Sequence, residues 1–277
     1  MSEFQADSRI PRRRFLKGVV ATTLPLLGGS VWAGSYRFGK SYHKKTLPRL
    51  KEPLKVVHLS DLHFGRWVKD KHLARWVDAS LAEQPDLILI TGDLTDHTTP
   101  ALEPLINELS RLKATTGVYG VWGNHDYDQG HSFRDELRDG LRQAGTQILQ
   151  NEGLSLRDDL YLAGIDDLWH GKPDLPEALS LCSDDQVCLL MAHIPDILPD
   201  VPGNVDVTFC GHTHGGQVKL PLIGAVTTSS AYGKRFLEGW IKEPVTAYVS
   251  RGLGMVTLPI RFLSQAEIAV FEFLPEG

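Results

Sequence analysis

The first 150 residues alternate between two hydrophobic patterns. Short apolar runs, typical of strands buried on both faces, cover residues 54–60, 86–92 and 117–123. Between and after them, apolar residues recur at helical spacing and predict helices over 68–84, 100–113 and 132–145. Further strands are predicted over 160–166, 187–194, 205–211, 246–252 and 268–274. This βαβαβα order followed by a strand-rich half predicts an α/β fold with stacked sheets flanked by helices.

The N-terminus follows a different pattern. The basic segment PRRRFLKG (11–18) precedes a weakly apolar stretch (19–34) that ends in small residues. This order is typical of an export signal, and RRRFLK resembles a twin-arginine signal; a solvated basic tail is the alternative. We therefore expect a signal or N-terminal anchor over 1–33, a linker over 34–52 and one domain over 53–277. The domain would lie in the periplasm or on the outer face of the cytoplasmic membrane.

Composition narrows the function classes. The chain of 277 residues is 42% hydrophobic and 23% charged, as in ordinary soluble globular proteins. Its net charge of −5 argues against non-specific nucleic-acid binding, although a locally cationic metal site can still bind phosphate. The three cysteines lack a metal-binding spacing. Cys182 and Cys188 either form a disulfide or are buried free thiols, and the sequence favours the thiols.

Residue types that commonly bind metals follow the predicted strands. They are Asp61 and His63, then Asp93, then Asn124, His125 and Asp126, then His193, and finally His212 and His214. Any one of them alone fits a turn or a cap. Together, carboxylate, amide and imidazole groups at strand ends suit divalent Mn, Fe or Zn. A bridging carboxylate would hold two ions ~3.5–4 Å apart, the spacing used for displacement at phosphorus.

The ordered blocks D-x-H, GD, GNHD, H and GHTH resemble those of the calcineurin-like metallophosphoesterase superfamily, over about residues 54–272. The resemblance implies two facing mixed β-sheets flanked by helices and a centre of two divalent ions (Mn, Zn or Fe). One ion would be bound by Asp61, His63, Asp93 and His214. Asp93 would bridge to the second, which Asn124, His193 and His212 complete. A metal-bridging hydroxide would attack phosphorus in line, while His125 contacts the phosphate or protonates the leaving oxygen and Asp126 orients His125.

Differences between branches of this superfamily narrow the subclass that the sequence resembles. The third block reads GNHD rather than the GNHE of protein Ser/Thr phosphatases, and no Tyr closely follows the GD block as in purple acid phosphatases. Residues 211–262 resemble the small bacterial branch related to the phosphodiesterases YaeI and YkuE. This implies a phosphodiester or pyrophosphate substrate, either a small molecule or lipid-linked, with possible membrane association.

Three alternatives remain. A UDP-2,3-diacylglucosamine pyrophosphatase of lipid A synthesis conflicts with export, because that substrate is cytoplasmic. A non-catalytic metal-binding scaffold would be expected to have lost ligands, whereas every ligand position is present. A nuclease is disfavoured by the acidic balance, so nucleic acid is not the expected partner. The oligomeric state is not indicated.

Other polar or apolar residues allow two interpretations each. His97 fits a pocket wall or a solvated loop, and Arg251 fits a phosphate clamp or a surface ion pair. Loop 253–260 fits core packing or a surface for acyl chains. Lys234 and Arg235 are expected to be solvated, with an anionic headgroup as the alternative. His58 is expected in the core, and surface positions are expected for His43, His72, His131 and His170.

Overall fold

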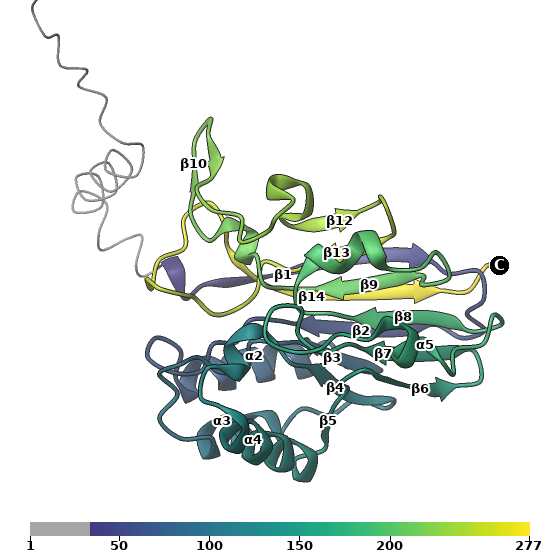
Figure 1. Cartoon of the computed structure of the whole chain (residues 1–277), viewed down its shortest axis with the longest axis horizontal. Coiled ribbons are helices and arrows are strands. Elements are labelled where there is room, and N and C mark those ends of the chain that lie inside the picture. Colours follow the sequence, from purple (N-terminus) through teal and green to yellow (C-terminus); the bar gives the residue numbers. More distant parts are fainter. Residues whose placement is uncertain (1–33) are drawn as a thin grey trace, which may run out of the picture.

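Two six-stranded sheets pack face to face in the computed structural model, which describes residues 34–277 (Figure 1). The first has the order β1 (Phe38–Thr46), β14 (Ala266–Leu274), β2 (Leu54–Leu59), β3 (Leu87–Thr91), β4 (Gly117–Val121), β5 (Thr146–Ile148). The second has the order β12 (Gly239–Ile241), β13 (Ala247–Val249), β9 (Val207–Cys210), β8 (Val187–Met191), β7 (Leu160–Gly164), β6 (Glu152–Arg157). Both sheets are mixed, so the predicted fold class is confirmed.

The first sheet is covered on its outer face by three helices (Figure 1): α2 (Asp70–Leu81), α3 (Glu103–Leu109) and α4 (His131–Gln143). Strands β2 to β5 run parallel to one another. Alternate residues of β3 face opposite sides: Ile88 packs in the helix-side core and Leu89 between the sheets. Burial on both faces explains why β3 is apolar throughout.

The second sheet shares the inter-sheet core, to which it contributes Leu162, Leu189 and Phe209. A short helix, α5 (Leu175–Leu179), and two 3-10 helices, η2 (Pro195–Asp200) and η4 (Gly233–Phe236), lie along its outer side. A separate hairpin consists of β10 (Lys219–Leu220) and β11 (Gly224–Ala225). Among the described residues, none of the helices is long and apolar enough to span a bilayer.

The predicted linker over 34–52 is wrong. Residues 38–46 form β1, which pairs in parallel with β14 along its whole length. Its polar, alternating sequence suits an edge strand with one exposed face, and it lacks the apolar run on which the strand predictions depended. The predicted signal or anchor over 1–33 lies outside the described residues.

The remaining side-chain predictions have mixed outcomes. His58 is buried in the core as expected, with Nε2 2.7 Å from Thr91 Oγ1. His72 is also buried, contrary to the expected surface position, because its ring stacks on Tyr36 at 4.5 Å between centroids. All three cysteines are free thiols, two buried and one (Cys182) half-buried.

Candidate metal centre

The predicted ligands lie in loops that follow β2, β3, β4, β8 and β9, with His214 opening η3 (His214–Gly216). Five of them have positive φ angles, between 47° and 70°: Asp61, His63, Asp93, His212 and His214. Non-glycine residues rarely adopt this conformation, and those that do gather at functional sites where the surroundings hold them. Backbone hydrogen bonds hold these loops together, since Asp61 N–H donates to the carbonyl of Gly92 and His63 N–H to that of Asp93.

Glycines allow the loops to approach the carboxylates. A Cβ atom added to Gly211 would overlap the Ser60 hydroxyl, and one added to Gly123 would overlap the Asp93 carboxylate. Neither neighbour is the free end of a long flexible side chain. The glycines of the GNHD and GHTH blocks are therefore required by packing around the carboxylates.

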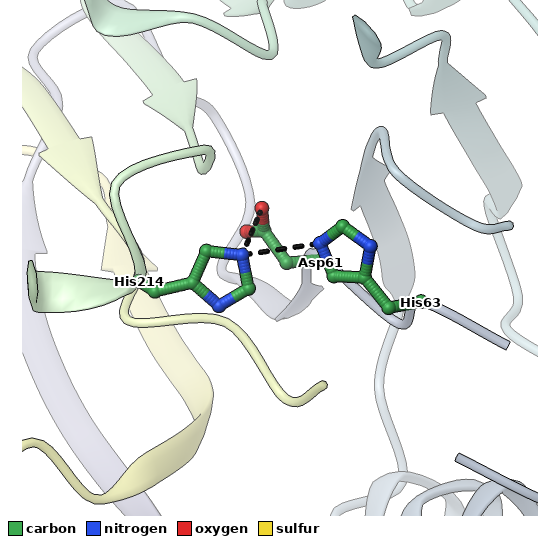
Figure 2. Close-up of side chains that lie close together, drawn as sticks. All are labelled: Asp61, His63 and His214. Carbon is green, nitrogen blue, oxygen red and sulfur yellow. Dashed lines mark hydrogen bonds and ion pairs between the residues drawn. The ribbon is translucent and has the colours of Figure 1, made fainter. Parts of the chain in front are cut away.

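Figure 2 shows the first group of side chains, Asp61, His63 and His214. The Nε2 atoms of the two histidines lie 3.1 Å apart, and His214 Nε2 is 3.4 Å from Asp61 Oδ1. Asp61 and His63 come from the loop after β2, whereas His214 comes from the loop after β9 in the other sheet. Their ligand-type atoms all lie within 4.8 Å of one another, an arrangement that can hold a divalent ion.

Asp93, His193 and His212 form a second group with the same spacing. His193 Nδ1–H donates to the carbonyl of Thr91 at 2.8 Å, and its Nε2 lies 3.1 Å from Asp93 Oδ2. The same Oδ2 atom is 3.4 Å from His63 Nε2 in the first group. Asp93 therefore lies between the two groups, where one carboxylate can reach two ions.

Four predicted ligands, His63, Asn124, His193 and His212, carry a buried polar atom that forms no hydrogen bond within the described residues. For Asn124 and His212 these atoms are Oδ1 and Nε2. Leaving such an atom unsatisfied costs about 1–3 kcal/mol. A cation shared with Asp93 and His193 would supply the missing interaction. The residues thus fit two divalent ions, and their nitrogen and oxygen donors suit Mn, Zn and Fe alike.

Burial and mutual charge set the ionisation of these side chains. Burial lowers the pKa of His63 and of His212 to about 3, so both are neutral. Burial also raises the pKa of Asp61 to about 6, against the charge of His193. Burial opposes the charge on His193, but the Asp93 carboxylate outweighs it and raises the pKa of His193 to about 10. A metal ion bound at neutral pH must therefore displace a proton from His193.

His125 lies beside both groups at the start of a 3-10 helix, η1 (Asn124–Tyr127). Its backbone N–H donates to Asp93 Oδ1 at 2.8 Å, and its ring packs edge-on against the His63 ring with 5.0 Å between centroids. Burial lowers the pKa of His125, but the charge of Asp93 and the hydrogen bond to Asp128 outweigh burial and raise it. An imidazole with a raised pKa at a cavity wall can donate a proton at neutral pH.

The structure corrects the predicted role of Asp126. Its carboxylate accepts hydrogen bonds from the N–H groups of Thr95 and Gly123, and so holds loops rather than the imidazole. Asp128 orients His125 instead, with Oδ2 2.7 Å from His125 Nδ1. A turn of 3-10 helix places residues i and i+3 together. In the stretch WGNHDYD, Asp128 lies three residues after His125, and this spacing could have predicted their contact.

The centre opens into a cavity of about 500 Å³. Besides the ligands it is lined by Arg66, Trp67, Asp96, His97, Thr98, Trp169, Ser229, Val256 and Thr257. Trp169 packs edge-on against the His212 ring at 4.4 Å, and the Arg66 guanidinium stacks over Trp67 at 4.8 Å. His97 is thus a pocket residue with an exposed side chain.

Two arginines make contacts other than those of a phosphate clamp. Arg251 does not line the cavity, so the clamp interpretation is wrong. It forms an ion pair at 2.6 Å, but with the buried Glu267 rather than at the surface. Arg261, which the sequence did not single out, is buried against the centre. It donates to the carbonyl of Gly254 at 2.7 Å, and its Nη2 lies 3.1 Å from His214 Nδ1. No local pattern distinguishes Arg261 from a surface arginine in the sequence.

Comparison with known proteins agrees with this geometry. The profile of the family described as calcineurin-like phosphoesterase matches residues 54–216, a range that includes every predicted ligand. The chain is 33% identical to the uncharacterized metallophosphoesterase YkuE of Bacillus subtilis, over 95% of this chain and 97% of YkuE. It is 31% identical to an uncharacterized metallophosphoesterase of Helicobacter pylori (96% and 73%) and 28% identical to the phosphodiesterase YaeI of Escherichia coli (96% and 100%). The chain belongs to the calcineurin-like phosphoesterase family.

Proposed function

We propose that the protein is a phosphodiesterase that uses two divalent metal ions. The observation that carries this proposal is the position of Asp93, whose Oδ2 atom lies 3.1 Å from His193 Nε2 and 3.4 Å from His63 Nε2. One ion would be held by Asp61, His63, Asp93 and His214. The other would be held by Asp93, Asn124, His193 and His212.

Two cations at these positions would bind phosphate oxygens, offset the charge of the transition state and lower the pKa of a water molecule. The side chains supply the remaining functions. Asp128 engages Nδ1 of His125, so Nε2 is the nitrogen that can protonate the leaving oxygen. Asp126 fixes Thr95 and Gly123, and thereby the loops that carry the ligands.

A diester fits the cavity better than a monoester. Arg66 is the only lysine or arginine among the described residues that line the cavity, so beyond the two proposed ions the site offers one permanent cation for the second negative charge of a monoester. Trp67 and Trp169 offer apolar surface for substituents of a diester on either side of the phosphate. The name of the relative YaeI, a phosphodiesterase, supports the same choice.

The test uses the full-length protein, stripped of metal with a chelator and reloaded separately with Mn, Zn or Fe. We expect metal-dependent hydrolysis of bis-p-nitrophenyl phosphate, faster than that of the monoester, and its loss in Asp93→Asn. Faster turnover of the monoester would refute the diesterase assignment. Two bound ions without turnover of any ester would support the scaffold alternative, and cleavage of UDP-2,3-diacylglucosamine alone would support the pyrophosphatase.

We also propose that the domain is exported, on the basis of the basic–apolar–small order of residues 11–34. The test is fractionation of cells that produce the chain with Arg12→Lys and Arg13→Lys together. We expect the protein to move from the periplasmic or membrane fraction to the cytoplasm. An unchanged distribution would exclude a twin-arginine signal.

A further inference from the structure

The β10–β11 hairpin projects from the body of the molecule (Figure 1) and carries an apolar turn. Leu222 at the turn is fully exposed, and Ile223 is 63% exposed. Only two residue pairs join the strands, so the hairpin gains little stability from its own pairing. The exposed Leu and Ile side chains add no stability, and a polar turn would serve the fold equally well. An apolar turn on a projecting hairpin is a candidate contact surface when further exposed apolar residues lie near it.

Other exposed apolar residues lie on segments that are hydrogen-bonded to the hairpin. Six of the nine exposed large apolar residues of the described chain lie within 222–263: Leu222, Ile223, Val226, Tyr232, Leu258 and Leu263. Hydrogen bonds join the segments that carry them. Lys219 N–H donates to the carbonyl of Phe262, and the Lys234 ammonium donates to the carbonyl of Ile223 at 2.7 Å. We call these six residues the hairpin surface.

Cations flank the hairpin surface. Lys234 and Arg235 are exposed, and neither forms an ion pair within the part of the chain that the structure describes. Apolar side chains beside unpaired cations suit an anionic bilayer, because the apolar groups enter the interface while the cations meet lipid phosphates. The core of a protein–protein interface is instead depleted of lysine. The charge pattern therefore favours lipid over a protein partner.

The hairpin surface adjoins the cavity and the start of the described chain. Ser229, Val256 and Thr257 line the cavity and lie within the same segments as the exposed apolar residues. Arg261 N–H donates to the Ser35 hydroxyl at 2.9 Å, so the chain joins the domain at this edge. The apolar stretch that precedes residue 35 in the sequence is thus connected beside the hairpin surface, and a retained anchor would meet the same membrane.

We propose that the hairpin surface docks on an anionic lipid bilayer with the cavity beside the interface. If the proposed phosphodiesterase function holds, the natural substrate is then a phosphoester attached to a membrane lipid. The docking depends only on the hairpin surface and its cations, whereas the substrate class also depends on the proposed function.

A fluorescent label can test docking directly in the full-length protein. The half-buried Cys182 is replaced by Ser, and an environment-sensitive dye is attached at Leu222→Cys or at the control Leu181→Cys. Leu181 is 74% exposed and lies in the loop that precedes β8, whereas His193 follows the other end of that strand. On addition of vesicles of phosphatidylcholine and phosphatidylglycerol, we expect a blue shift and about a twofold rise in emission at position 222 only.

Vesicle binding without a shift at position 222 would overturn the proposal. A shift that grows with protein concentration without vesicles would assign the surface to a second copy, and would also overturn it. Lys234→Glu with Arg235→Glu should weaken binding to anionic vesicles about tenfold or more and leave binding to neutral vesicles unchanged. Because the label reports no turnover, a failure of the proposed phosphodiesterase would leave this result intact, and hydrolysis of a soluble diester without the shift would overturn docking alone.

Discussion

The metal centre and the hairpin surface break the usual distribution of residues in opposite ways. The centre buries carboxylates and imidazoles, with Asp61, His63 and Asp93 almost completely inaccessible to solvent. The hairpin surface exposes Leu222 and Ile223, residue types that are mostly buried elsewhere in the described chain. Buried polar groups and exposed apolar patches are the informative exceptions in a folded protein.

The two regions therefore differ in what completes them. At the centre, unpartnered atoms such as Asn124 Oδ1 and His212 Nε2 reduce stability until a cation binds. At the hairpin surface, the exposed side chains neither stabilise nor strain the fold until an apolar phase covers them. Changes at the centre should consequently alter chemistry and metal content, whereas changes at the hairpin should alter only where the protein lies.

The largest effect is expected from Asp93→Asn. The amide removes the charge that lies between the two groups and leaves His193 without its counter-charge. We expect kcat/KM for the diester to fall about 10⁴-fold or more, because the cations supply most of the transition-state stabilisation. Metal analysis should show fewer than two ions per chain. Two tightly bound ions with normal turnover would show that Asp93 does not bridge them.

His125→Gln should lower kcat about 10²–10⁴-fold, as expected for loss of a general acid. Its metal content should remain unchanged, since His125 is assigned to proton transfer rather than to binding. A diester with a much more acidic leaving group needs less protonation and should lose less rate in this variant. Loss of metal from His125→Gln would instead make the residue a ligand.

Some features of the fold and of the metal centre can be predicted from the sequence, and the reason is physical. Strands buried on both faces require continuous apolar runs, and ligand loops at their ends need particular residue types, so β3 and Asp93 are both visible in the sequence. The edge strand β1 and the buried Arg261 are not visible. Their environments come from distant partners, β14 and the Gly254 carbonyl, which no local pattern encodes.

Metal affinity should rise with pH. Ion binding displaces a proton from His193, whose pKa is raised to about 10, so affinity should rise about tenfold per pH unit between pH 6 and 8. Below pH 6 the dependence should steepen, because Asp61, with a pKa of about 6, must also lose a proton. His63 and His212, with pKa values near 3, release none. Titration calorimetry in two buffers measures the released protons, and a pH-independent affinity would contradict this ionisation pattern.

The variants Asp128→Asn and Asp126→Asn distinguish the residue that orients His125 from the residue that holds the ligand loops. Asp128→Asn removes a charge that raises the pKa of His125, so kcat should fall about tenfold and the alkaline limb of the pH–rate profile should move to lower pH. Asp126→Asn presents an NH₂ group to a backbone N–H, which should lower the free energy of unfolding by about 1–3 kcal/mol. An unmoved alkaline limb in Asp128→Asn, or a moved one in Asp126→Asn, would restore the orienting role to Asp126.

The smallest effect is expected from Leu222→Ser with Ile223→Ser. Because neither side chain is buried, the free energy of unfolding should change by no more than about 0.5 kcal/mol. Hydrolysis of a soluble diester should be unaffected, since both residues lie outside the cavity lining. Chemical denaturation and diester assays of this variant and of Leu181→Ser measure both quantities. A large loss of stability would show that the turn packs against the domain in solution, and the contrast between a centre completed by cations and a surface completed by lipid would no longer hold.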